Sequence, residues 1–190
     1  EYMFIDDTAC NLASLNLIKF SKKNKKLDIN AFEHACRLWT LTLEISVMMA
    51  QFPSKEIAQK SFDYRTLGLG YANIGGLLMS WGVPYDSDEG RAICSSISAI
   101  MTGISYATSA EIAKELGPFS KYKLNSKDML RVIRNHKRAA DGFKDGYDNL
   151  TINPVPLIKE DCPSEDLPNA ASKAWELSLI HISEPTRRDP

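Results

Sequence analysis

Hydrophobic and polar residues alternate near the start of the chain. Ala13, Leu15 and Leu17 are separated by single polar residues, and a period of two is typical of a strand with one buried face. The pattern therefore predicts a strand near residues 10–18, preceded by a loop. The lysine-rich stretch 21–26 has no apolar residue, and we expect a solvated turn there rather than a phosphate-binding patch.

Farther along, apolar residues recur every three or four positions, which is typical of a helix. Asn30 is expected to cap the first helix, which stops before Pro53. The helix is nearly apolar all round, so we expect it to be deeply packed. Its predicted apolar stripe consists of Leu38, Leu41, Ile45 and Met48.

A long helix is predicted after a capping box made by Asp86 and Glu89. Its buried stripe should be Ile93, Ile97, Ile100 and Ile104, and Gly117-Pro118 should end it. The other predicted elements are a helix over 54–64, a β-compatible stretch over 65–71, and helices over 72–81 and 126–140, followed by an extended connection over 141–168. Strand and helix patterns thus alternate, which indicates an α/β fold.

Composition narrows the class of protein. The chain has 190 residues, of which 44% are hydrophobic and 25% charged, as in globular proteins. Lys and Arg number 23 against 24 Asp and Glu, so no charge excess indicates a nucleic-acid partner. The longest strongly apolar stretch, 41–49, is shorter than the about 20 residues that cross a bilayer, so no membrane partner is expected.

Both ends of the chain carry signals of processing rather than of folding. The chain starts at Glu1, with no basic or signal-like run after it, and we expect it to be a fragment of a longer protein. The stretch 177–190 resembles a translated sequencing adapter, so we treat it as a non-native tail. Residues 1–176 are then the natural segment, and His181 carries no functional weight.

Several candidate motifs have simpler structural explanations. Gly68 and Gly70 suggest a dinucleotide-binding turn, but Asn73 stands where the fingerprint requires glycine or alanine, and we expect close strand–helix packing instead. His34 and His136 have no metal-ligand spacing and are expected to be structural.

Two further motifs also favour structural roles. The basic stretch 131–138 lacks the interleaved aromatic residues of single-strand binders, so a solvated helix face is expected. Glu44 lies among apolar residues and should pair with an Arg or Lys of a neighbouring helix.

The four cysteines suggest two different kinds of role. Cys10, Cys36, Cys94 and Cys162 have neither zinc spacing nor the density of a disulfide framework, so we expect no metal site and a reducing, cytoplasmic location. The last three are expected to be structural. Cys10 stands at the entry of the predicted strand, close in sequence to acidic residues, and is a candidate for chemistry.

Four stretches carry a resemblance to a known family. They are EYMFIDDTACNLASLNL at 1–17, FPSKEI at 52–57, YRTLGLGYAN at 64–73 and PYDSDEGR at 84–91. Together they resemble the catalytic subunit of adenosylcobalamin-dependent (class II) ribonucleotide reductase, over residues 1–176. The resemblance implies an α/β fold, here a helix-rich part of a ten-stranded α/β barrel.

The same resemblance implies the site residues. In that family a finger loop carries Asn-x-Cys-x-Glu, and a second cysteine follows the glutamate by nine positions, the separation of Glu1 and Cys10. Glu1 would be the general base and bind substrate, and Cys10 would be one of two reducing thiols whose disulfide partner lies outside the chain. The family's asparagine and radical-bearing cysteine would lie just upstream of Glu1.

The resemblance further implies adenosylcobalamin as cofactor, a ribonucleotide as substrate, with diphosphates expected, and a thioredoxin-like reductant. Homodimer formation by the full-length enzyme is left open. Because the radical cysteine is not in the sequence, we expect the isolated fragment to be inactive. Two alternatives remain: the class I large subunit, and a mostly helical, non-catalytic nucleotide-binding or interaction module.

Overall fold

A computed structural model describes residues 5–9 and 11–183 of the chain. It contains both strands and helices. The strands are β1 (Leu12–Asn16), β2 (Ser21–Lys22), β3 (Lys26–Leu27) and β4 (Gly68–Ala72). The α-helices are α1 (Ile29–Met49), α2 (Lys55–Tyr64), α3 (Ile74–Ser80), α4 (Asp88–Leu116), α5 (Tyr122–Ala140) and α6 (Asp166–Ser183). Two 3₁₀ turns, η1 (Leu17–Phe20) and η2 (Lys159–Asp161), complete the described elements.

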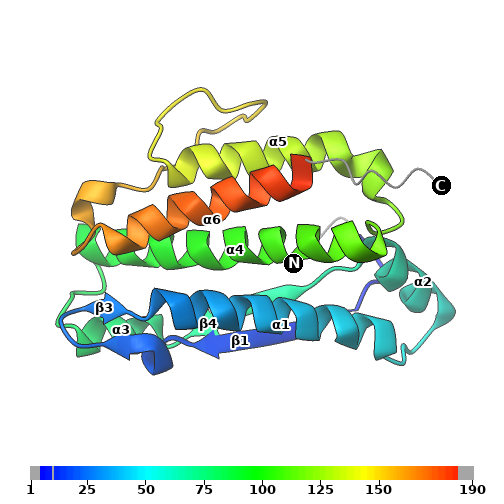
Figure 1. Ribbon diagram of the computed structural model, residues 1–190, viewed down its shortest axis with the longest axis horizontal. Coiled ribbons are helices and arrows are strands. Elements are labelled where there is room, and N and C mark those ends of the chain that lie inside the picture. Colours follow the sequence, from blue (N-terminus) through cyan, green and yellow to red (C-terminus); the bar gives the residue numbers. More distant parts are fainter. Residues whose placement is uncertain (1–4, 10, 184–190) are drawn as a thin grey trace.

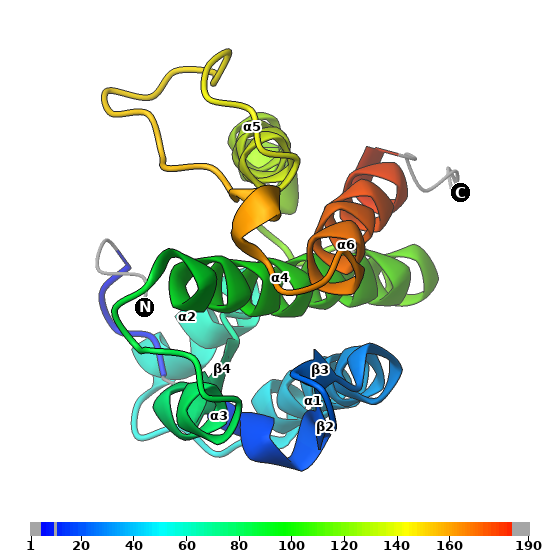
Figure 2. The same cartoon turned by 90° about the vertical axis from the view of Figure 1, so that its left-hand side faces the viewer.

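Helix α4 lies in the middle of the molecule. The strands, α1 and α3 lie on one side of it, and α5 and α6 lie on the other (Figures 1 and 2). The predicted isoleucine stripe of α4 is confirmed, since Ile93, Ile97, Ile100 and Ile104 are all buried. They belong to the main core cluster, which also contains residues from both sides of α4: Leu15 and others from the strand side, and residues of α6 from the other. The core therefore spans the layers and is organised by this one helix.

Strands β1 and β4 pair in parallel, with Leu12 opposite Gly68 and Asn16 opposite Ala72. Parallel neighbours need a long crossover, and here α1 and α2 provide it. Leu15 faces the core, whereas the side chains of alternate residues such as Leu12 are exposed. The described residues contain this two-stranded sheet and the small β2–β3 hairpin, and neither sheet closes into a barrel.

The sequence placed the wrong face of α1 in the core. The buried residues are Phe32, Cys36, Thr40, Leu43 and Val47. The predicted stripe of Leu38, Leu41, Ile45 and Met48 is 43–65% exposed. Because apolar residues surround this helix, their spacing does not identify the face that meets the core. The expectation that this helix is deeply packed is therefore wrong, because one apolar face of it is exposed among the described residues.

Helix starts depend on small polar residues. The helix predicted over 54–64 is confirmed as α2, and Ser54 caps it because its hydroxyl accepts a hydrogen bond from the Ile57 amide. Asp28, rather than Asn30, caps α1. Ser87, rather than Asp86, caps α4 by accepting from the Gly90 amide at 3.0 Å. Both errors are one or two residues, because several residues with capping ability stand next to one another.

The glycines of β4 serve strand–strand contact rather than the expected strand–helix contact. A Cβ at Gly68 would collide with the side chain of Leu12 and lie 3.1 Å from the Asn11 carbonyl oxygen. At Gly70 a Cβ would lie 3.7 Å from the Ser14 hydroxyl. The crowding at Gly68 therefore comes from β1 and the residue before it.

Helices α4 and α6 approach closely at Gly103. A Cβ there would lie 2.9 Å from both the Cβ and the carbonyl carbon of Ala174. Ala171 and Ala174 are fully buried in the same cluster. Small residues on both helices let the two backbones meet, so this contact depends on the absence of a side chain at position 103.

Helix α5 covers α6 through a ring contact. His136 stacks on Trp175 with ring centroids 4.9 Å apart and planes 6° apart. Ile133 of α5 is fully buried in this second cluster. The structural role expected of His136 is thereby confirmed.

The last part of the described chain agrees only in part with the prediction made from the sequence. Residues 141–158 form the expected irregular connection, which projects beyond α5 (Figure 2). Helix α6 then runs through residue 177, where the predicted non-native tail begins. The Ser178 hydroxyl is buried and has no hydrogen-bond partner among the described residues. None of the described helices is long and apolar enough to span a membrane.

Replacing Gly103 with alanine should destabilise the chain. The new Cβ would press on the backbone of α6, and overpacking of this kind costs about 1–3 kcal/mol of unfolding free energy. Gly75→Ala is the matched control, because a Cβ there meets only the Tyr85 ring at 3.9 Å. Urea unfolding of the control should show equal or slightly higher stability. Equal stability of both variants would contradict the close α4–α6 contact.

The free energy of unfolding should also depend on the protonation of His136. Burial lowers the pKa of His136 below its ordinary value of 6.5, so the unfolded chain binds this proton more readily than the folded chain. The free energy of unfolding should therefore fall as the pH drops below 6.5. His136→Phe keeps a ring on Trp175 and should flatten this part of the profile. Parallel profiles of the two proteins between about pH 5.5 and 7 would disprove the coupling.

Candidate active site

The two catalytic residues expected from the sequence, Glu1 and Cys10, lie outside the described residues. Their neighbours at positions 5–9 and 11–16 are described. The candidate site is therefore built from the contacts that hold the chain on either side of position 10.

Asn11 holds the chain immediately after position 10. Its side-chain amide donates to the Leu43 carbonyl of α1 at 2.7 Å, and the Ser46 hydroxyl donates to its side-chain oxygen at 3.4 Å. Its backbone carbonyl accepts from the Gly68 amide at 2.8 Å. Asn11 thus connects the start of β1 to both α1 and β4.

The chain immediately before position 10 is held by α2. The Ala9 amide donates to the hydroxyl of Ser61, which is buried, at 3.3 Å. Lys60 donates to the Asp6 carbonyl at 2.8 Å and lies 3.7 Å from the Asp7 carboxylate. Position 10 therefore lies between two segments that are each bonded to a different helix.

A pocket of about 180 Å³ is lined by the residues that precede and follow position 10 in the sequence. It lies between Ala9 and Asn11, the end of α1, the connection to α2, and α2 itself. Its lining residues are Ala9, Asn11, Ser46, Val47, Ala50, Gln51, Phe52, Pro53, Ser61 and Thr66. Pockets for small organic ligands usually measure about 300–1,000 Å³, so this one is too small to enclose a nucleotide. It can admit only a small group.

The predicted pairing of Glu44 is confirmed beside this pocket. Arg65 Nε lies 2.5 Å from Glu44 Oε1, and a second guanidinium nitrogen donates to the Glu44 carbonyl at 3.2 Å. Arg65 ends α2 in the left-handed conformation, with φ of 49°. The two side chains are only 17% and 14% exposed, so the pair connects α1 to the end of α2 in a poorly hydrated place.

The described thiols are poorly suited to redox chemistry. Burial raises the pKa of the Cys36 thiol to about 12, and it also raises the pKa of Cys162. A thiol must ionise to attack a disulfide, so both are poor nucleophiles. The Cys94 thiol lies 3.3 Å from the Tyr71 hydroxyl. All three are free cysteines.

The structural role expected of Cys36 is confirmed, because its side chain is fully buried in the core. Among residues 5–9 and 11–183 there is also no group of three or more His, Cys, Asp or Glu residues that could hold a metal ion.

The described residues thus form an α/β arrangement with a parallel strand pair and with polar contacts at the start of its first strand. The model of the family described as "Ribonucleotide reductase, barrel domain" matches residues 1–179. The chain belongs to this family.

Individual relatives agree with the family. The chain is 65% identical over 180 residues to the vitamin B12-dependent ribonucleotide reductase of Agrobacterium fabrum and 63% identical over 180 residues to that of Bradyrhizobium diazoefficiens. Each match covers 94% of this chain and 14% of the relative. The protein of the same name from Rhodopirellula baltica is 42% identical over 184 residues, which cover 97% of this chain and 16% of the relative. The resemblance found in the sequence is confirmed, and the chain spans about one seventh of the first two relatives.

Sequence reasoning missed the residues that hold position 10. Asn11, Lys60 and Ser61 carry no motif, and their partners lie 32 to 54 positions away in the sequence. The only local signal was that Asn11 adjoins the candidate cysteine. Contacts of this kind depend on how α1 and α2 fold back over β1.

The Glu44–Arg65 pair provides a test of this architecture. Glu44→Ala leaves a poorly hydrated guanidinium without its partner, which should lower the free energy of unfolding by about 3 kcal/mol. Asp86→Ala is the matched control, because it also breaks an ion pair, here with Arg91. The Asp86 side chain is 95% exposed. The control should show no measurable change in chemical denaturation. Equal losses in the two variants would contradict the structural role of the Glu44–Arg65 pair.

Proposed function

We propose that this chain forms part of the catalytic barrel of an adenosylcobalamin-dependent ribonucleotide reductase. The observation that carries the proposal is the 65% identity, over 94% of the chain, to a protein named vitamin B12-dependent ribonucleotide reductase. The relatives reported above, at 42–65% identity, share that name, which disfavours the class I large subunit.

The exposed surfaces support a place inside a larger α/β barrel. Strands β1 and β4 are joined by helices and pair in parallel, as barrel strands do. The sheet face that carries Leu12 and the apolar stripe of α1 are exposed among the described residues. Large exposed apolar patches mark surfaces that contact other protein. We propose that further strands and helices of a ten-stranded barrel cover them.

The roles of Glu1 and Cys10 follow from the reaction. After a thiyl radical removes the 3′-hydrogen of the ribose, the 2′-hydroxyl leaves as water when a base takes the 3′-hydroxyl proton and an acid protonates the leaving oxygen. Glu1 is the proposed base. Cys10 and a partner thiol outside this chain supply two electrons and two protons, one proton to the leaving oxygen and one to C2′, and they end as a disulfide.

The contacts around position 10 suit that role. A thiol that attacks substrate must be held in place while still reaching a second cysteine. The Ala9 amide bonds to Ser61 of α2 and the Asn11 side chain bonds to α1, so the chain is held just before and just after position 10 in the sequence, and both residues line the 180 Å³ pocket. We infer that these contacts position the Cys10 thiol.

Adenosylcobalamin is the proposed cofactor, and when bound it supplies a radical by cobalt–carbon homolysis. The described pockets, of about 340 and 180 Å³, are too small to enclose a corrin ring with its nucleotide loop. The described residues therefore do not form a cobalamin site by themselves, and none is assigned to the cofactor.

The finer features are proposals of the same kind. They are a ribonucleoside diphosphate as substrate, a thioredoxin-like reductant and a cytoplasmic location. The reductant follows from the family's chemistry, because a disulfide formed in each turnover must be reduced before the next.

A segment exchange tests the proposal. Residues 1–176 would replace the matching segment of the Agrobacterium fabrum relative, and ribonucleotide reduction would be assayed with adenosylcobalamin and each of the di- and triphosphates. The exchanged enzyme should be active, whereas the 190-residue chain alone should not. Cys10→Ser should abolish multiple turnover, and Glu1→Gln should lower the rate at least about 100-fold.

Cys162→Ser is the matched control, because that half-buried thiol lies 3.4 Å from the Ser96 hydroxyl and a serine hydroxyl can keep this contact. Its activity should stay close to that of the exchanged enzyme. Full turnover of the Cys10→Ser protein would refute the assignment. A correctly folded but inactive exchange would instead favour the non-catalytic interaction module.

A further inference from the structure

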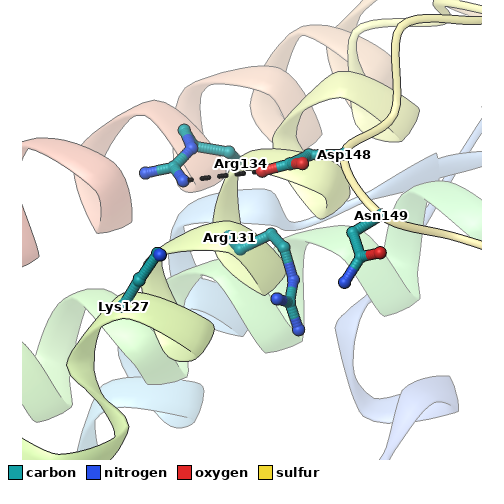
Figure 3. Close-up of a pocket in the computed structure, with 5 residues that line it drawn as sticks. All are labelled: Lys127, Arg131, Arg134, Asp148 and Asn149. Atoms are coloured by element: carbon teal, nitrogen blue, oxygen red, sulfur yellow. Dashed lines mark ion pairs between the residues drawn. The ribbon is translucent and has the colours of Figure 1, made fainter.

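A cationic pocket lies on the side of the molecule away from the strands. Lys127, Arg131 and Arg134 follow one another at intervals of four and three along α5, so their side chains share one face of the helix. With Asp148 and Asn149 they line a pocket of about 340 Å³ (Figure 3). The sequence predicted only a solvated helix face here. The pocket exists because the segment after α5 folds back over that face.

The second wall of the pocket is held by its own contacts. The side-chain amide of Asn135 donates to the Asp148 carbonyl at 2.9 Å, and its oxygen accepts from the Asp148 amide at 2.9 Å. Arg138 donates to the Asp145 carbonyl and lies 4.5 Å from the centroid of the Phe143 ring. These contacts fold the loop onto α5 without using the cations that line the pocket.

Those cations are incompletely neutralised. Arg131 pairs with Asp128 at 2.7 Å, and Arg134 lies 4.0 Å from Asp148. Lys127 has no ion pair or hydrogen bond among the described residues. Three positive groups thus face two carboxylates. Like charges at these helical spacings repel one another, and an anion between them would relieve that repulsion.

The lining also restricts the chemistry of the ligand. The lining residues carry no aromatic or aliphatic side chain, so nothing in the pocket would hold a base or an acyl chain. Arg guanidinium groups bind phosphate through paired N–H donors, and Lys adds a point charge. Figure 3 shows Arg131 and Asn149 extending toward the same side of the pocket, where the amide can add a further hydrogen bond.

We propose that Lys127, Arg131 and Arg134, with Asn149, bind the phosphate groups of a small phosphorylated ligand. Helix α5, which carries the three cations, lies across α4 from β1 and β4 (Figures 1 and 2), so the pocket is separate from the candidate active site. Nucleic acid is disfavoured, because the pocket is small and offers no ring on which a base can stack.

Calorimetric titration of the 190-residue chain tests this proposal. The probes are inorganic phosphate, pyrophosphate and ATP, at low salt. Pyrophosphate and ATP should bind with similar affinity and more tightly than phosphate, because the triphosphate chain carries the recognition and the base adds little. Affinity should fall as salt is raised. Lys127→Gln and Arg131→Gln should each weaken pyrophosphate binding about tenfold.

Lys123→Gln is the matched control, because it removes the same charge from an exposed position of α5 outside the pocket. It should weaken binding less than Lys127→Gln does, since Lys123 lines no part of the pocket and acts only through its longer-range charge. Circular dichroism checks that each variant is folded. Should Arg131→Gln unfold, the exposed Lys127→Gln variant still tests the site.

Three results would overturn the proposal. They are no binding of any probe at about 10 mM, equal weakening by Lys123→Gln and Lys127→Gln, and tighter binding of a uridine oligonucleotide than of pyrophosphate at the same residues. The last result would assign the surface to nucleic acid instead.

Discussion

The parallel pairing of β1 with β4 is the constraint on which the rest of the structure depends. Parallel strands cannot be joined by a tight turn, so α1 and α2 must cross over between them. Gly68 permits the pairing, because any side chain there would collide with Leu12. Once the strands are paired, both crossover helices lie against the start of β1. The contacts of Asn11 and Ala9, on either side of position 10, result from this arrangement.

How much of the fold could be predicted depended on whether a helix is apolar on one side or on all sides. The isoleucine stripe of α4 was predicted correctly, because it is regular and joins the core over several turns. For α1 the sequence predicted the helix but not its buried face, since apolar residues occur all round it. The face that carries Leu38 and Ile45 is exposed. We propose that other parts of a barrel cover it.

Local pattern marked Cys10 as a candidate for chemistry, but the roles of Glu1 and Cys10 came from the resemblance of several matched stretches. The residues that hold the chain on either side of position 10 carry no periodic or spacing signal. Asn11 and Ser61 act through partners distant in sequence. Similarly, the basic stretch of α5 gave no sign that the loop after it forms the second wall of a pocket. Tertiary folding decides both arrangements.

The central claim is that Glu1 and Cys10 are the base and a reducing thiol of a radical enzyme. Sequencing the parent gene upstream of the codon for Glu1 tests it most directly. The account predicts a cysteine two positions before Glu1 and an asparagine two positions before that cysteine. Any other residue at the cysteine position would contradict the assignment of both residues.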